Sequence, residues 1–123
     1  MSGILVITEQ NAGAWHKMSF ETLAAAQQLG RDLGLPVKAV VFGHGVAPLA
    51  SELSQYQLDG VIALNHELLA QYTADAVTSA LASLLADLNP DYVLFPHTYQ
   101  VRDFAPKLAT RFERVLISDA IGY

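Results

Sequence analysis

Apolar and polar residues follow one another along the chain in blocks that predict strands and helices in turn. Five short apolar runs, rich in branched side chains, are typical of strands buried on both faces of a sheet; they cover residues 4–8, 37–42, 61–64, 92–95 and 115–117. Between the runs, apolar residues recur every three or four positions, which predicts helices. Strands that alternate with helices pair in parallel through right-handed crossovers. The pattern therefore predicts a Rossmann-like three-layer α/β/α fold with a parallel sheet of about five strands.

Residue types that begin or end helices divide the helical blocks. Ser19, Thr73 and Asp103 are predicted N-caps, and Pro106 then falls in the first turn of the last helix. Gly34, followed two residues later by proline, is predicted to end the first helix. A shorter, weaker helix is predicted over residues 46–53, and residues 9–17 are predicted to form a loop. The face of the first helix that packs on the sheet is predicted to comprise Leu23, Ala26, Gly30 and Leu33.

The connection between the fourth strand and the last helix carries most of the chemistry in the chain. His97, Thr98, Arg102 and Asp103 lie there within seven residues, together with a tyrosine. If the strand order is 3-2-1-4-5, the chain reverses direction between the first and fourth strands, and ligands of such sheets bind at that switch point. Thr8 and Glu9 lie at the end of the first strand. We therefore expect them to face the loop that holds His97.

Composition narrows the classes of partner. The 123 residues are enough for one domain, and 52% of them are hydrophobic against 15% charged, with a mean hydropathy of +0.29. This excess of apolar residues predicts burial against a partner or self-association. A net charge of −5 and a pI near 5.1 argue against nucleic acid. The chain has no cysteine, no targeting segment and no apolar run long enough to span a membrane, so we expect a cytoplasmic protein.

Common catalytic and nucleotide-binding motifs are absent from the sequence. It contains no G-x-G-x-x-G, Walker A or G-x-S-x-G segment. The four histidines lie on separate loops without metal-ligand spacing, and three of them are predicted to be merely exposed; only His97 stands out by position. An enzyme built around His97 and Glu9 would lack a recognisable nucleophile. The residues alone leave a Rossmann-like domain with one chemically rich loop, for which scaffold, nucleotide binder and enzyme remain open.

The segment from His97 to Ala109 resembles a known family. It reads H-T-Y-Q-V-R-D-F-A-P-K-L-A, and Ser118-Asp119 follow the predicted fifth strand. The alpha subunits of electron transfer flavoproteins have a similar H-T-x-x-G-R-D-L-A-P-R-L-A segment and a later S-D. The opening residues 4–9 and the alanine-rich first helix resemble the same family, so that the similarity covers essentially the whole chain. Val101 replaces the glycine that is usual in the family.

This resemblance implies that residues 1–123 form the N-terminal domain of an electron transfer flavoprotein alpha subunit. FAD would be bound by a second, C-terminal domain, and we expect no cofactor, metal or catalytic site in this chain. The domain would pack with the beta subunit, and the complete heterodimer would carry electrons from acyl-CoA and other flavoprotein dehydrogenases to a quinone oxidoreductase or another acceptor. His97, Thr98, Arg102 and Asp103 would be candidates for an interface. The alternative is a stand-alone nucleotide-binding domain of universal-stress type, which normally carries a glycine-rich loop where this chain has residues 96–99.

Overall fold

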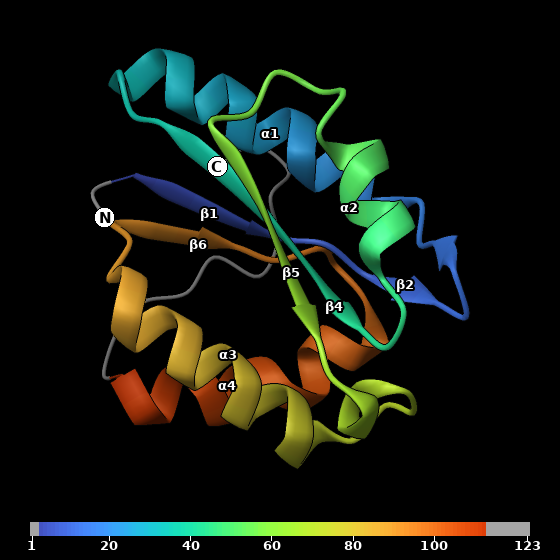
Figure 1. Cartoon of the computed structure of the whole chain (residues 1–123). Coiled ribbons are helices and arrows are strands. Elements are labelled where there is room, and N and C mark those ends of the chain that lie inside the picture. The colour runs from blue at the N-terminus through green and yellow to red at the C-terminus, as the bar shows by residue number, and fades with distance from the viewer. Residues whose placement is uncertain (1–2, 113–123) are drawn as a thin grey trace.

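A parallel sheet forms the middle layer of residues 3–112, the part of the chain that the computed structural model describes. Its four strands lie in the order β5-β4-β1-β6, as Figure 1 shows; they are β1 (Ile4–Ile7), β4 (Val37–Gly43), β5 (Gly60–Asn65) and β6 (Tyr92–Leu94). This confirms the predicted order of the first four strands. The predicted fifth strand, residues 115–117, lies outside the described residues.

Helices cover both faces of the sheet and complete the three predicted layers. One face is covered by α1 (Met18–Leu33) and α2 (Ala47–Leu53). The other face is covered by α3 (Ala74–Leu88) and α4 (Tyr99–Phe112), with the short 3-10 helix η1 (Glu67–Leu69) beside them (Figure 1). Between β1 and α1, where we predicted a loop, β2 (Gln10–Asn11) and β3 (Ala14–Trp15) form a small antiparallel hairpin.

The strands have buried residues on both faces, and their side chains divide between two cores. Ile4 and Val6 of β1 pack with Leu23 of α1, whereas Leu5 and Ile7 face the opposite side, where Phe104 of α4 lies. This division follows from the alternation of side chains along a strand. Phe104 makes edge-to-face contacts with the rings of both Phe42 and Phe95 and so fixes α4 on the sheet.

The ends of α1 and α3 are set partly as predicted. Thr73 caps α3 by accepting a hydrogen bond from the N–H of Ala76 at 3.2 Å, and Gly34 ends α1 in the left-handed conformation with φ of 67°. The predicted cap at Ser19 is wrong, because this residue lies inside α1 and its hydroxyl is bound to the backbone of Glu9. Leu33 is also misplaced by the sequence pattern, since its side chain is 47% exposed.

The start of α4 differs from the prediction by five residues. The helix begins at Tyr99, and the hydroxyl of Thr98 accepts the N–H of Val101 at 3.2 Å, which is the geometry of an N-cap. The prediction that Asp103 caps the helix is therefore wrong. Asp103 lies within the second turn, and Pro106 lies inside the helix rather than in its first turn.

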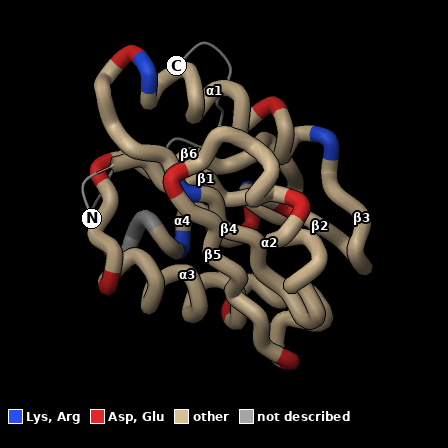
Figure 2. Tube along the Cα trace, turned by 45° about the horizontal axis from the view of Figure 1, so that its top comes forward, with Lys and Arg blue, Asp and Glu red and all other residues tan. Residues whose placement is uncertain are grey.

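Charged residues are spread over the molecule. Lysines and arginines lie just before α1, in α1, in β4 and in α4, and in Figure 2 they do not gather on one face of the described residues. Nucleic-acid-binding proteins typically present a basic stripe or patch, and the described residues do not form one. No helix within residues 3–112 is both long and apolar enough to cross a membrane.

Candidate functional site

A cavity of about 200 Å³ opens where the carboxyl ends of β1 and β6 diverge. It is lined by side chains from the segment that precedes α1, from the loop before α4 and from the first turn of α4: His16, His97, Thr98, Tyr99 and Arg102. This is the switch point of the sheet, because β4 and β6 lie on opposite sides of β1 and the connections leave in opposite directions. The geometry therefore brings the loop that holds His97 to the switch point, as predicted, and the binding of a ligand there stays a prediction.

A buried carboxylate forms the base of this region. Glu9 is 8% exposed, and its Oε1 atom accepts a hydrogen bond of 2.6 Å from the hydroxyl of Thr98, which is 6% exposed. The backbone of Glu9 is held as well, because its N–H donates to the hydroxyl of Ser19 and its carbonyl accepts from the same hydroxyl. The two segments that we expected to face each other, the end of β1 and the loop before α4, are thus joined directly.

Arg102 and His97 form the outer wall of the cavity. The Nη2 atom of Arg102 lies 2.7 Å from the Nε2 atom of His97. An arginine can only donate, so Nε2 accepts and the imidazole is held in the tautomer with its proton on Nδ1. The guanidinium carbon also lies 5.9 Å from the centre of the Tyr99 ring, within reach of a cation–π contact. Tyr99 itself is 88% exposed.

His16 is a residue of the site that the sequence analysis left among the exposed histidines. It is half-buried, lines the cavity, and its Nδ1 atom accepts the N–H of Met18 at 3.1 Å. A neutral imidazole bonded in this way carries its proton on Nε2. The sequence did contain a signal for His16. This residue lies in the same connection between the first strand and the first helix as Glu9, and Glu9 was expected at the switch point. The hairpin formed by β2 and β3 returns His16 to that point, and the N–H of His16 donates to the carbonyl of Glu9.

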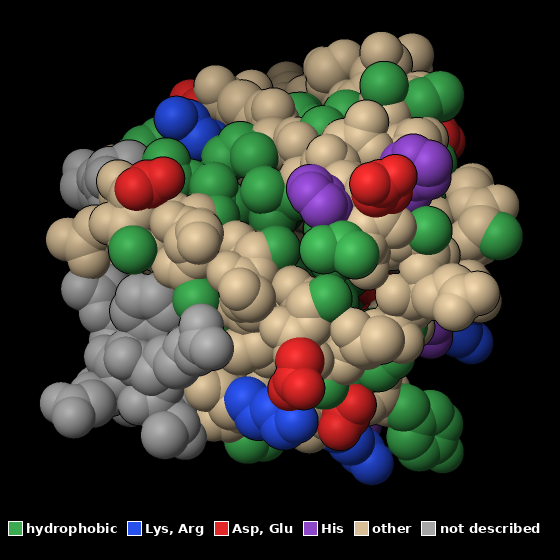
Figure 3. Space-filling view, turned by 60° about the horizontal axis from the view of Figure 1, so that its bottom comes forward, with side chains coloured by type: hydrophobic (Ala, Val, Ile, Leu, Met, Phe, Trp, Pro, Cys, Tyr) green, Lys and Arg blue, Asp and Glu red, His purple; other side chains and the backbone are tan. Residues whose placement is uncertain are grey.

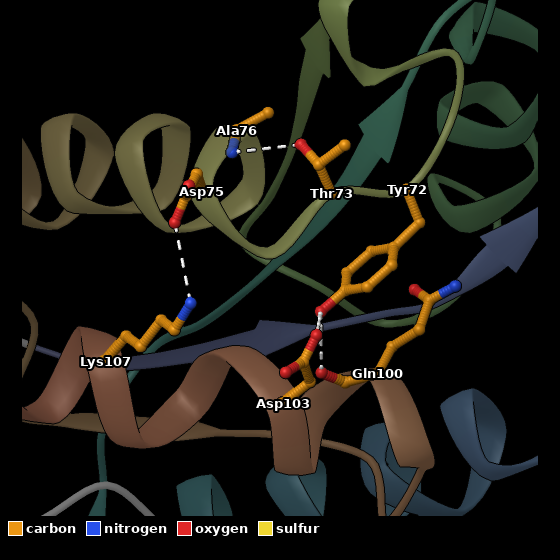
Figure 4. Close-up of polar contacts among 7 residues, drawn as sticks. All are labelled: Tyr72, Thr73, Asp75, Ala76, Gln100, Asp103 and Lys107. Carbon is orange, nitrogen blue, oxygen red and sulfur yellow. Dashed lines mark hydrogen bonds and ion pairs between the residues drawn. The ribbon is translucent and has the colours of Figure 1, made fainter.

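Asp103, the fourth predicted site residue, is directed elsewhere. Figure 4 shows its carboxylate beneath Tyr72, whose hydroxyl donates to Asp103 Oδ2 at 2.7 Å and lies 3.3 Å from the carbonyl oxygen of Gln100. Burial, followed by the hydrogen bond and the charge of Asp103, raises the pKa of Tyr72 well above its usual value. Asp103 therefore joins α4 to the segment before α3. A nearby contact of 3.5 Å between Lys107 and Asp75 joins α4 to the first turn of α3 itself (Figure 4).

The chemistry available in the cavity is that of recognition. A guanidinium, two imidazoles and one exposed phenol surround it, while the hydroxyl of Thr98 is occupied by Glu9 and Val101. Within residues 3–112, no three histidine or acidic side chains are grouped closely enough to hold a metal ion. The arrangement suits the binding of a small acidic group.

A second hollow lies beside the edge strand β5. This groove of about 560 Å³ runs between β5, η1 and α3 and is lined mainly by small and apolar residues: Leu64, Asn65, His66, Leu68, Leu69, Asp75, Ala76, Ser79, Ala80 and Ser83. Figure 3 views the molecule from the side of α3 and α4, and it shows hydrophobic side chains gathered in the upper part of the view, beside histidine side chains. The described part of the chain thus presents two distinct surfaces that could contact another molecule.

Comparisons with known proteins identify the relatives of the chain. The family model described as an electron transfer flavoprotein domain matches residues 4–123. The alpha subunit of the electron transfer flavoprotein of Syntrophomonas wolfei is 36% identical over 121 residues, which are 98% of this chain and 37% of the relative. The alpha subunit from Bacillus subtilis is 36% identical over 118 residues, 96% of this chain and 36% of the relative. The acryloyl-CoA reductase electron transfer subunit beta of Anaerotignum propionicum is 31% identical over 116 residues, 94% of this chain and 32% of the relative.

The chain spans about a third of the length of these curated relatives, between 32% and 37%. Its similarity to them nevertheless extends over almost all of its own residues. These findings agree with the resemblance inferred from the segment that begins at His97, and none of them supports a stand-alone nucleotide-binding domain of universal-stress type.

Proposed function

Because the chain belongs to the electron transfer flavoprotein family, we propose that it serves as the N-terminal domain of an alpha subunit and packs against a beta subunit. The observation that carries this proposal is the match of residues 4–123 to the family domain, together with relatives that are named alpha subunits. In this role the domain is a scaffold: it presents surfaces to other parts of the assembly and performs no chemical step itself.

The flavin of the complete protein is proposed to lie away from the switch point, because the residues there do not fit a flavin dinucleotide. The cavity of about 200 Å³ is smaller than the roughly 300–1,000 Å³ typical of pockets for drug-sized ligands. In addition, the carboxylate of Glu9 lies just after β1, where dinucleotide-binding folds place a glycine-rich turn under the pyrophosphate. A buried negative charge at this position would repel the negatively charged pyrophosphate.

The electron path of the complete protein is part of the same proposal. We expect the assembled heterodimer to accept electrons from flavoprotein dehydrogenases and to pass them to a quinone oxidoreductase or another acceptor, with FAD as the carrier. The names of two relatives support a range of partner enzymes, since one is an electron transfer subunit of an acryloyl-CoA reductase and another is a subunit of a lactate dehydrogenase (NAD(+),ferredoxin).

Calorimetric titration of the chain with the electron transfer flavoprotein beta subunit of the same organism tests the scaffold role. We expect saturable binding of one beta subunit per chain. Light scattering of the chain alone is the control, because self-association would lower the amount of free chain available to bind the beta subunit. Absence of heat and of any change in mass on mixing would overturn the proposal.

The visible spectrum tests the placement of the flavin. The chain, incubated with excess FAD and passed through a desalting column, should emerge colourless. A stoichiometric flavin spectrum retained by the chain alone would show that the dinucleotide binds within these residues.

A further inference from the structure

Arg102 is a cation without a carboxylate partner among the described residues. The chain contains 12 acidic and 7 basic residues, yet the ion pair that the structure shows within residues 3–112 joins Lys107 to Asp75. The two carboxylates near the site are engaged elsewhere, Glu9 by Thr98 and Asp103 by Tyr72. The guanidinium of Arg102 therefore faces the cavity with most of its five N–H donors available to an incoming acceptor.

Neighbouring side chains hold this guanidinium in place. His97 accepts one of its hydrogen bonds at 2.7 Å, and the ring of Tyr99 lies 5.9 Å from its central carbon. A fixed guanidinium loses less conformational entropy when it binds than a freely moving one. Arginine and tyrosine are also enriched among the residues that dominate binding at protein interfaces. The 88% exposure of Tyr99 leaves a large aromatic surface beside the charge.

From this arrangement we propose that Arg102, positioned by His97 and Tyr99, binds a carboxylate side chain of the beta subunit in the cavity at the switch point. This inference rests on the proposed function, and it adds the chemistry of the contact and its place on the domain. Arginine and carboxylate form paired, nearly parallel hydrogen bonds, which give a subunit interface orientation as well as affinity.

Charge and size favour a carboxylate over a phosphorylated small molecule. The buried carboxylate of Glu9 lies behind Thr98, so a singly charged group meets less repulsion at the cavity than a doubly charged phosphate does. The cavity of about 200 Å³ can take the end of one side chain, whereas a nucleotide needs more room. The exposed ring of Tyr99 offers further contact area to a protein surface.

Affinities of variants for the beta subunit test the inference. Arg102→Ala should weaken binding about tenfold or more and should reduce its dependence on salt. Arg102→Lys should recover only part of the affinity, because lysine keeps the charge without the planar fork. Lys107→Ala is the matched control: it removes the same charge from the exposed side of the same helix, and it should change affinity less than about twofold. Equal thermal midpoints of the free variants show that folding is unaffected.

Three outcomes would overturn the inference, and each has a separate meaning. If the unaltered chain does not bind the beta subunit, the proposed function fails with it. If the unaltered chain binds but Arg102→Ala lowers the affinity no more than Lys107→Ala does, the proposed Arg102–carboxylate contact is wrong and the scaffold role is retained. If millimolar inorganic phosphate shifts the imidazole resonances of His16 and His97 in the free chain, and Arg102→Ala abolishes the shift, the site belongs to a small phosphorylated molecule. Restoration of Arg102→Glu binding by an acidic-to-arginine substitution in the beta subunit would confirm the contact.

Discussion

At the scale of single residues, Thr98 links the start of α4 to the end of β1. Its hydroxyl accepts a hydrogen bond from the N–H of Val101 and donates one to the side chain of Glu9. One buried oxygen therefore caps the helix and also provides a hydrogen bond to a buried carboxylate. Removing the Thr98 hydroxyl takes away the hydrogen bond that Glu9 accepts from it in the folded chain. A buried charged group that loses a partner is more costly than a lost helix cap.

Thr98→Val should therefore destabilise the chain by about 3 kcal/mol, the sum of a cap and a hydrogen bond to a charge. Thr73→Val, which removes only the cap of α3, should cost about 1 kcal/mol. Urea unfolding of both variants measures the difference. Similar losses in the two would mean that the Glu9 contact contributes little to stability.

Thr78 offers a residue-scale prediction in the opposite direction. Its side chain is buried in α3, and its hydroxyl has no hydrogen-bond partner within the described residues. Thr78→Val replaces an unsatisfied hydroxyl by a methyl group of similar shape and should stabilise the chain by about 1 kcal/mol. Thr22→Val in α1 is the control, because the hydroxyl of Thr22 donates to the carbonyl of Met18 and its loss should bring no gain. A thermal midpoint of Thr78→Val at or below that of the unaltered chain would contradict this reading.

At the scale of elements, the packing of α1 on β4 depends on one glycine. A Cβ atom at Gly30 would lie 2.6 Å from Cγ2 of Val37 and 3.0 Å from the backbone oxygen of Leu35. Helix propensity alone favours alanine over glycine by about 1 kcal/mol. The contact with backbone cannot be relieved by turning a side chain, so the steric cost should exceed that gain.

Gly30→Ala should accordingly lower the free energy of unfolding by about 1–3 kcal/mol, the usual cost of overpacking. Ala24→Gly, at an exposed position of the same helix, measures the propensity term alone and should cost about 1 kcal/mol. Denaturant titration gives both values. An increase in stability for Gly30→Ala would show that α1 can move away from β4 without loss.

A second element-scale contact joins α4 to the segment before α3 through Tyr72 and Asp103. The raised pKa of Tyr72 means that the folded chain keeps the phenolic proton more tightly than the unfolded chain does. Below pH about 10 both states hold the proton, so the stabilisation is fully present; above it only the unfolded state releases the proton, and the free energy of unfolding falls. Tyr72→Phe should flatten this decline between pH 9 and 11, as measured by urea unfolding at about half-unit steps of pH.

Sequence reasoning identified most elements but misplaced contacts that depend on distant partners. Residue patterns within one segment were sufficient for the four described strands of the sheet, for Thr73 and for Gly34. Thr98 and Asp103 are both good capping residues, and the choice between them is made by Glu9, 89 residues away from Thr98 along the chain. The hairpin of β2 and β3 has only two residues per strand and so gives no periodic signal.

At the scale of the whole molecule, the two candidate surfaces lie on different parts of the sheet. The cavity around Arg102 lies at the carboxyl ends of the central strands β1 and β6, whereas the groove of about 560 Å³ follows the edge strand β5. An edge strand without charged residues, such as residues 60–65, is itself open to pairing with another chain. Binding of a partner at one surface leaves the other exposed, so the two can be distinguished by experiment.

Amide hydrogen exchange of the chain, alone and saturated with the beta subunit, tests the central claim most directly. The account predicts slower exchange in the complex for residues 14–17 and 97–104, which surround the cavity, because a bound subunit excludes water and suppresses local opening. Exchange along residues 60–69 should change little. Protection confined to residues 60–69, with none around the cavity, would contradict the claim that the beta subunit binds at the switch point of the sheet.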